Sequence, residues 1–80
     1  MEPQSELFTK DLYEAAFLFA QGQKLIRLER DGSIYWFVFR NDNYAADQLR
    51  DLFWSGEGLV SGRSYADAIR TLKDRLFAQR

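Results

Sequence analysis

The sequence predicts a small α+β domain in the order α-β-β-α-α, a two-stranded antiparallel hairpin covered on one face by three helices. The hairpin is indicated by Asp31-Gly32 between two apolar stretches, since both central residues of a type I′ turn need a positive φ. Apolar residues recur with helical spacing once before this hairpin and twice after it. A length of 80 residues suits one domain with a small core. We expect residues 1–7 to form a flexible N-terminal arm and residues 8–80 to form the domain.

The first helix is expected to begin at Thr9, because threonine is a good N-cap residue. Phe8 and Tyr13 then occupy the two positions of a hydrophobic staple, which would fix how the chain enters the helix. Gly22 is expected to end the helix as residue C′, where a left-handed backbone favours glycine.

The first strand of the hairpin is expected over residues 23–30, and the second is expected after the Asp31-Gly32 turn, up to Arg40. With Asp31-Gly32 at the centre of a two-residue turn, Leu28 faces Tyr35 and Ile26 faces Phe37, and this aromatic side is assigned to the core. The opposite side is assigned outward, although much of it is large and apolar. Its members are Leu25, Arg27, Ile34, Trp36, Val38 and Arg40.

Two further helices follow the hairpin. Asn41-Asp42-Asn43 ends the second strand, and apolar residues from Ala45 to Phe53 follow helical spacing until Ser55-Gly56-Glu57-Gly58. Ser64 is expected to cap the third helix, with Asp67 at the reciprocal position of a capping box.

Three motifs occur in order along the chain. They are Phe8-x-Thr-x-Asp-Leu-Tyr13-x-Ala-Ala16, Phe53-Trp54-x-Gly56-Glu57 and Ala68-x-Arg70-x-Leu72-Lys73. Together with the basic and aromatic hairpin, they resemble a small family of bacterial and phage-associated domains of unknown function, from Phe8 to Leu76. The resemblance implies a bacterial or prophage origin and a small stand-alone protein, and it supplies no catalytic residues.

Composition argues against several classes of chemistry. The chain has no histidine and no cysteine, so it lacks the usual general base near neutral pH, a thiol nucleophile and the common zinc ligands. Its formal net charge of −1 gives no global attraction to nucleic acid or anionic lipid. No apolar run approaches the roughly 18 residues of a membrane span. We therefore expect a cytoplasmic protein that is not an enzyme, with no cofactor, no metal site and no membrane partner.

The outward side of the hairpin is the candidate binding site. In one interpretation, two protomers bury this side or pair their strand edges and form a homodimer. In a second, it receives a different protein by strand addition or side-chain docking. In a third, Trp36 and the arginines form a stacking platform for single-stranded nucleic acid, as in an accessory protein of a phage or mobile element. Finally, the chain itself could cover Trp36. The prediction is a non-catalytic, self-associating interaction module, with the nucleic-acid function as the alternative.

Two other segments are of interest. Phe53-Trp54-Ser55-Gly56-Glu57 is interpreted as core and helix C-cap, the alternative being a surface loop that presents Trp54 and Glu57. The last helix carries basic residues interrupted by Asp67 and Asp74, which is typical of a solvated face of mixed charge. These basic residues are Arg63, Arg70, Lys73, Arg75 and Arg80.

Overall fold

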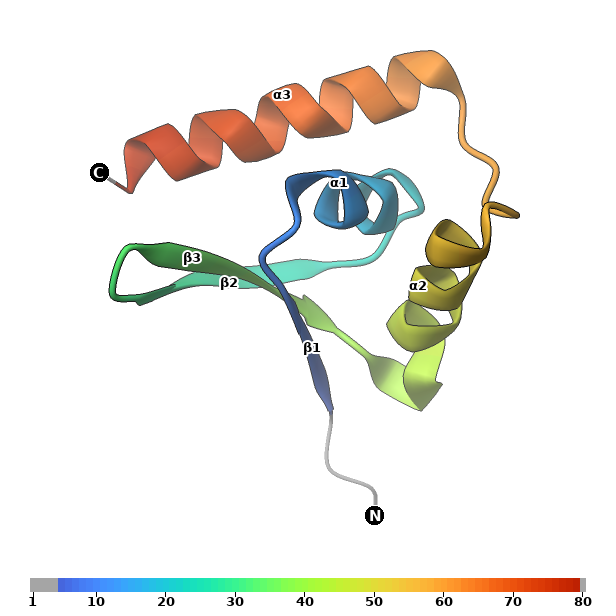
Figure 1. Ribbon diagram of the computed structural model, residues 1–80, viewed down its shortest axis with the longest axis horizontal. Coiled ribbons are helices and arrows are strands. Elements are labelled where there is room, and N and C mark those ends of the chain that lie inside the picture. The colour runs from blue at the N-terminus through green and yellow to red at the C-terminus, as the bar shows by residue number, and fades with distance from the viewer. Residues whose placement is uncertain (1–4, 80) are drawn as a thin grey trace.

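The computed structural model describes residues 5–79, which form one antiparallel sheet and three α-helices (Figure 1). In chain order the elements are β1 (Glu6–Thr9), α1 (Leu12–Ala20), β2 (Leu25–Asp31), β3 (Ile34–Arg40), a 3-10 turn η1 (Asp42–Tyr44), α2 (Ala45–Ser55) and α3 (Gly62–Ala78). The sheet has the strand order β1-β3-β2. The predicted α+β class is therefore confirmed.

The predicted hairpin is present as β2 and β3, but it is not the whole sheet, and the order α-β-β-α-α is not matched because a third strand precedes the first helix. β1 pairs antiparallel with β3, with Glu6 opposite Arg40 and Phe8 opposite Val38. Glu6 and Leu7 were expected in the N-terminal arm, whereas residues 1–4 of that arm lie outside the described residues. Burial alternates along β1, as it does along a strand with one face on the core, but four residues are too few for a clear sequence signal.

The first helix begins later than predicted, with Asp11 as its N-cap. The Asp11 carboxylate accepts hydrogen bonds from the backbone N–H groups of Tyr13 (2.8 Å) and Glu14 (3.0 Å). The Thr9 hydroxyl instead accepts a bond from the Asp11 N–H, 3.1 Å away. The proposed staple is also wrong, since Phe8 belongs to β1 and both Phe8 and Tyr13 are exposed.

The hairpin turn is centred on Gly32-Ser33, with Asp31 opposite Ile34. Of the two central residues only Gly32 has a positive φ (64°), the sign pattern of a type II′ turn. The predicted register is therefore wrong by two residues, and Leu28 faces Phe37. A shift of two leaves the side chains from Arg27 to Arg40 on their predicted faces, because the period of a strand is two.

The other helix ends follow local capping chemistry. Gly22 (φ 93°) and Gly56 (φ 80°) adopt the left-handed backbone where α1 and α2 end, as predicted. The third helix is capped by Ser61, not Ser64: the Ser61 hydroxyl accepts a hydrogen bond from the Ser64 N–H at 3.0 Å. The helix therefore includes Gly62 and Arg63, which were expected in a turn.

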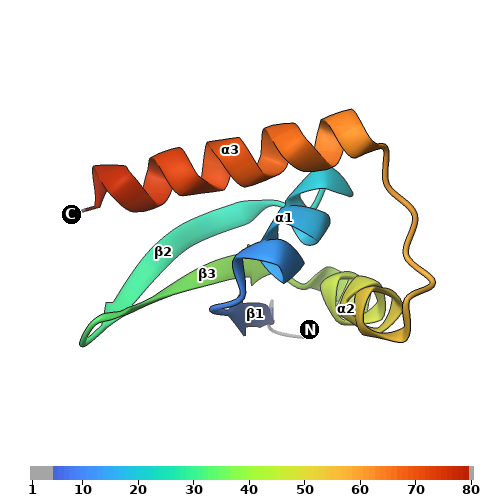
Figure 2. The ribbon, with the colours of Figure 1, turned by 45° about the horizontal axis from the view of Figure 1, so that its top comes forward.

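All three helices contribute to a core on one side of the sheet, with α1 between the sheet and α3 (Figure 2). The fully buried members of this core are Leu7, Ala15, Ala16, Leu18, Leu25, Phe37, Phe39, Ala46, Ala68 and Leu72. The sheet residues in this set lie on one face, so the opposite face carries no helix from residues 5–79. That uncovered face is where the predicted site falls.

Candidate interaction surface on the open face of the sheet

The uncovered side of the sheet, called the open face below, consists of the outward residues of the three strands and their flanks. Alternation along the strands and the observed register place these residues together. They are Glu6, Phe8 and Lys10 on and after β1; Ile34, Trp36, Val38 and Arg40 on β3; and Lys24, Ile26, Arg27, Glu29 and Asp31 on and before β2.

Leu25 is the one predicted site residue that does not belong to the open face. A β-bulge between Leu25 and Arg27 inserts Ile26 as an extra residue, so Leu25 faces Phe39 and is buried in the core. Ile26 is exposed in its place. The assignment of Leu25 outward and Ile26 inward was wrong because a bulge reverses the alternation on one side of it.

Val38 lies on the open face, yet its exposed fraction is 0%. Its neighbours on the two sides are Phe8 of β1 and Arg27 of β2, and the Arg27 side chain extends across the middle strand to Glu6 on β1. Arg27 Nη2 and Nη1 lie 2.9 and 3.0 Å from the two Glu6 carboxylate oxygens, and Arg27 Nε donates to Glu29 at 2.7 Å. The same hydrogen bonds from Arg27 hold the pKa of Glu6 below its ordinary value, and those from Glu6 and Glu29 raise the pKa of Arg27. We call this cluster the Arg27 bridge.

Beside the Arg27 bridge, toward the hairpin turn, the face is apolar. Phe8 is 42% exposed and Ile34 is 40% exposed, while Trp36 is half-buried between them. The Lys10 ammonium lies 5.9 Å from the centroid of the Trp36 ring, a cation–π distance. Phe8 and Trp36 line an open hollow of about 440 Å³ with Glu29, Arg30 and Asp31. This hollow therefore combines apolar walls with two carboxylates and one guanidinium.

A second hollow of about 450 Å³ lies at the other end of the face, lined by Glu6, Lys24, Ile26 and Arg40. Arg40 Nη2 is 3.0 Å from an Asp42 carboxylate oxygen, whereas the buried Arg40 Nε has no hydrogen-bond partner. Two cations and one carboxylate line this hollow, so its charge is opposite in sign to that of the first. The open face is thus polarised along its strands.

Sequence reasoning missed the contribution of β1 to this surface. Glu6 supplies the acceptor of the Arg27 bridge, Phe8 supplies exposed apolar area, and Lys10 covers part of Trp36. The sequence offers no clear signal for this strand, because each side of Glu6–Thr9 carries one polar and one apolar residue.

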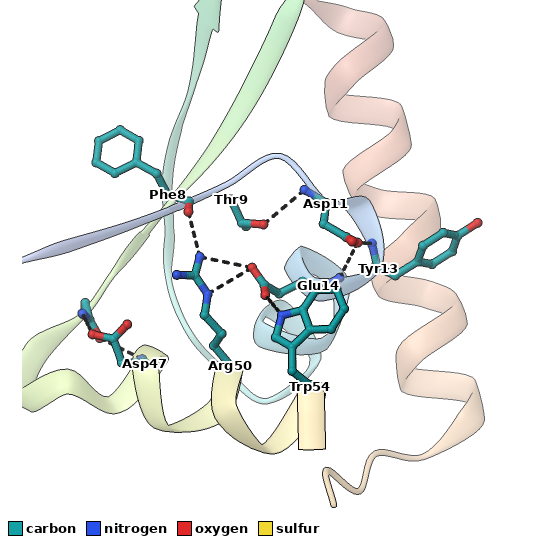
Figure 3. A network of polar contacts seen from close by, with 9 residues as sticks. Phe8, Thr9, Asp11, Tyr13, Glu14, Asp47, Arg50 and Trp54 are labelled. Carbon is teal, nitrogen blue, oxygen red and sulfur yellow. Dashed lines mark hydrogen bonds and ion pairs between the residues drawn. The ribbon is translucent and has the colours of Figure 1, made fainter. Parts of the chain in front are cut away.

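The segment 53–57, which ends α2, combines features of both interpretations made for it. Gly56 ends the helix, and Phe53 is half-buried with its ring edge-on to Trp54 at 5.1 Å between centroids. Trp54 is 63% exposed, but its indole N–H donates to the carboxylate of buried Glu14 on α1 (Figure 3). Trp54 is therefore a structural contact that also presents ring surface to solvent.

Among the basic residues of the last helix, Arg75 lines a hollow with Arg27 and Leu28 of β2, whereas the two hollows of the open face described above include none of them. Arg63, Arg70, Lys73 and Arg75 are all exposed, and Arg80 lies outside the described residues. Within residues 5–79, no three His, Cys, Asp or Glu side chains are grouped to hold a metal ion. No described helix has the length and apolar character needed to cross a bilayer.

Comparison with known proteins returns no matching family model, curated protein or solved structure. The resemblance to phage-associated domains therefore stays a prediction, and the functional argument depends on the open face itself.

Proposed function

We propose that this protein is a small non-catalytic interaction module that forms a homodimer by burying its open face against the same face of a second copy. The observation that carries the proposal is the uncovered cluster of Phe8, Ile34 and Trp36 beside the Arg27 bridge. Removing such area from water is favourable, and apolar patches rimmed by polar groups are typical of protein contacts.

The charge pattern supports a second copy as the occupant. The open face carries acidic residues toward the hairpin turn and basic residues at its other end. A partner of one charge sign would match only half of this face. A second copy can offer both signs, because a twofold axis brings different parts of the same surface together.

The Arg27 bridge also suits burial in an interface. Its guanidinium already has carboxylate partners in Glu6 and Glu29, so covering it leaves no isolated charge. A buried cation with satisfied hydrogen bonds costs far less than an unpaired one. The centre of the face is therefore polar, and each of its charges has a partner of opposite sign.

Single-stranded nucleic acid is the alternative occupant, and the half-exposed Trp36 ring is the feature that favours it. Phosphate binding requires free cations, since phosphate neutralisation supplies most non-specific affinity. Arg27 and Arg40 are instead engaged by Glu6, Glu29 and Asp42. Phosphates would have to displace these carboxylates or depend on Lys10, Lys24 and Arg30, so a protein partner is favoured.

Sedimentation velocity over a range of protein concentrations tests the proposal. The wild type should shift from monomer to dimer as concentration rises, with little dependence on salt. Trp36→Glu should shift it toward monomer by placing a charge in the desolvated patch. Leu59→Glu is the matched control, because Leu59 is almost fully exposed and lies in the α2–α3 connection away from the open face.

A strict monomer at every concentration would contradict self-association. Fluorescence titration with oligo-dT then decides the alternative, using Trp54→Phe so that Trp36 is the remaining tryptophan. Nucleic-acid binding would quench Trp36 and weaken steeply with added salt. If the protein is a monomer and the oligonucleotide leaves the Trp36 emission unchanged, both functions are excluded and a different protein is favoured as the partner.

A further inference from the structure

We infer that the two copies stack with reversed strand direction, about a twofold axis that crosses the strands, so that the acidic hollow of one copy covers the basic hollow of the other. The inference depends on the proposed self-association and specifies its geometry. It follows from where charged residues lie along β2 and β3.

The charge of the outward residues on β2 and β3 changes sign from one end of the open face to the other. Lys24 and Arg40 line the hollow at one end, and Glu29 and Asp31 line the hollow near the hairpin turn. Between them lies the level of Val38 and Trp36, which are successive outward residues on the middle strand. If the second copy is placed with its strands reversed about a point between these two residues, its acidic residues lie over the basic residues of the first copy.

The resulting contacts are complementary at each level. Trp36 lies over Val38 of the second copy, and Arg27 lies over Glu29 of the second copy. Lys24 lies over Asp31 of the second copy, and Arg40 over Ile34. Each contact occurs twice in such an interface, since the same patch serves both subunits. No two charges of like sign meet in this arrangement.

A twofold axis parallel to the strands is the competing arrangement. It brings Lys10 over Glu29 and Glu6 over Lys24 of the second copy. It also places Arg40 over Arg40 of the second copy. That contact supplies no acceptor for the Arg40 Nε, which has no hydrogen-bond partner. Juxtaposed like charges in an interface oppose association, so this orientation is the less favourable one.

Cysteine cross-linking tests the orientation directly, because the chain has no cysteine of its own. The Lys24→Cys and Asp31→Cys variants are mixed under mild oxidation, and the products are separated by gel electrophoresis without reductant. The mixture should form a disulfide-linked heterodimer in large excess over either variant alone. Each variant has a single cysteine, so no internal disulfide can form. Neither variant should cross-link to itself, because in the reversed arrangement equivalent cysteines lie at opposite ends of the face, roughly 20 Å apart.

Charge exchange supplies a second measurement. Lys24→Glu and Asp31→Lys should each weaken the dimer about tenfold or more, and the double variant should regain most of the affinity. Both residues are exposed, so the monomer should keep its fold, as checked by circular dichroism.

The outcomes separate the two proposals. A monomeric wild type contradicts the proposed function itself. A dimer that cross-links through Glu6→Cys with Lys24→Cys, and not through Lys24→Cys with Asp31→Cys, overturns the orientation alone. A dimer insensitive to every variant of the open face indicates pairing through strand edges and overturns both.

Discussion

The guanidinium of Arg27 on β2 forms a two-point ion pair with the carboxylate of Glu6 on β1, although β3 lies between these strands. Arg27 Nη2 and Nη1 are 2.9 and 3.0 Å from the two Glu6 oxygens. The pair therefore links the two edge strands across β3, in which Val38 lies opposite Arg27 and is fully buried. It also helps to hold β1, which has only four residues of backbone pairing.

The first prediction is a pH dependence of this link. Because Arg27 lowers the pKa of Glu6 in the folded state, the contribution to stability is fully present above the unfolded pKa. It is lost as the pH falls through the lowered folded pKa. The difference in Tm between wild type and Glu6→Gln should therefore be present at neutral pH and shrink below about pH 4. Both groups are exposed, so the difference should be small, and the solvent-exposed Glu57→Gln should show none.

A second prediction concerns the hairpin turn. Gly32 has a φ of 64°, where a β-branched side chain is strained, whereas Ser33 has no positive φ. Gly32→Val should lower the free energy of unfolding by about 1–3 kcal/mol, and Ser33→Ala should change it by no more than about 0.5 kcal/mol. Urea denaturation measures both. Equal effects of the two substitutions would contradict the position of the turn.

The hairpin shows how far local sequence signals reach. Aspartate and glycine between apolar stretches located the turn, and alternation placed Tyr35, Phe37 and Phe39 of β3 toward the core. The register required knowing whether Asp31 or Ser33 accompanies Gly32 at the centre, because type I′ and type II′ turns accept different pairs. Local chemistry left that choice open, and pairing across the whole sheet decides it.

The candidate site depended on features without a local signal. Ile26 is the extra residue of a bulge, and a bulge is defined by the pairing with the neighbouring strand. Periodicity along β2 alone therefore assigned Leu25 to the wrong face. Glu6 likewise pairs with Arg40, which is far away in the sequence, so no local pattern indicates the pairing. Residues of β3 could therefore be assigned from the sequence, while those contributed by β1 and the bulge could not.

A third prediction separates the two sides of β3. Phe37 is fully buried, so Phe37→Ala should cost about 3–5 kcal/mol through lost contacts and a residual cavity. Ile34→Ala, at an exposed position of the same strand, should cost a dilute monomer much less. Chemical denaturation at low protein concentration compares them. A larger loss for Ile34→Ala would mean that the open face is covered in the monomer.

A fourth prediction uses the close approach of the α2–α3 connection to α1. A Cβ built on Gly58 would lie 2.6 Å from a carbon of the Phe17 ring, which is itself buried. Gly58→Ala should therefore destabilise the fold by about 1–3 kcal/mol, because the ring must move within a packed core. Gly62→Ala has open space around the new methyl group and a helical position, so it should be neutral or stabilising by up to about 1 kcal/mol. If both changes are neutral, the connection does not pack on Phe17.

A polar contact connects α1 with α2, and its residue on α1 is the buried Glu14. Glu14 is 3% exposed, and Arg50 on α2 lies 3.2 Å from one of its oxygens (Figure 3). Arg50 also donates to the backbone carbonyl of Phe8 at 2.7 Å, so one guanidinium connects α2 to both α1 and β1. The Trp54 indole satisfies the other Glu14 oxygen. A buried carboxylate with these partners fixes how α2 docks.

The last prediction tests that docking. Glu14→Ala removes the carboxylate that accepts from Arg50 and from the Trp54 N–H. It should cost about 2–4 kcal/mol, and not more, because Arg50 is partly exposed and keeps the Phe8 carbonyl as an acceptor. Glu14→Gln keeps an acceptor for the indole and removes the charge, so its cost should be smaller, about 1–2 kcal/mol. Trp54→Phe should resemble Glu14→Gln, because it removes a single donor while retaining the ring that packs on Phe53. Urea denaturation followed by circular dichroism ranks the three. Glu14→Ala no more costly than Glu14→Gln would show that α2 is held by its apolar contacts alone.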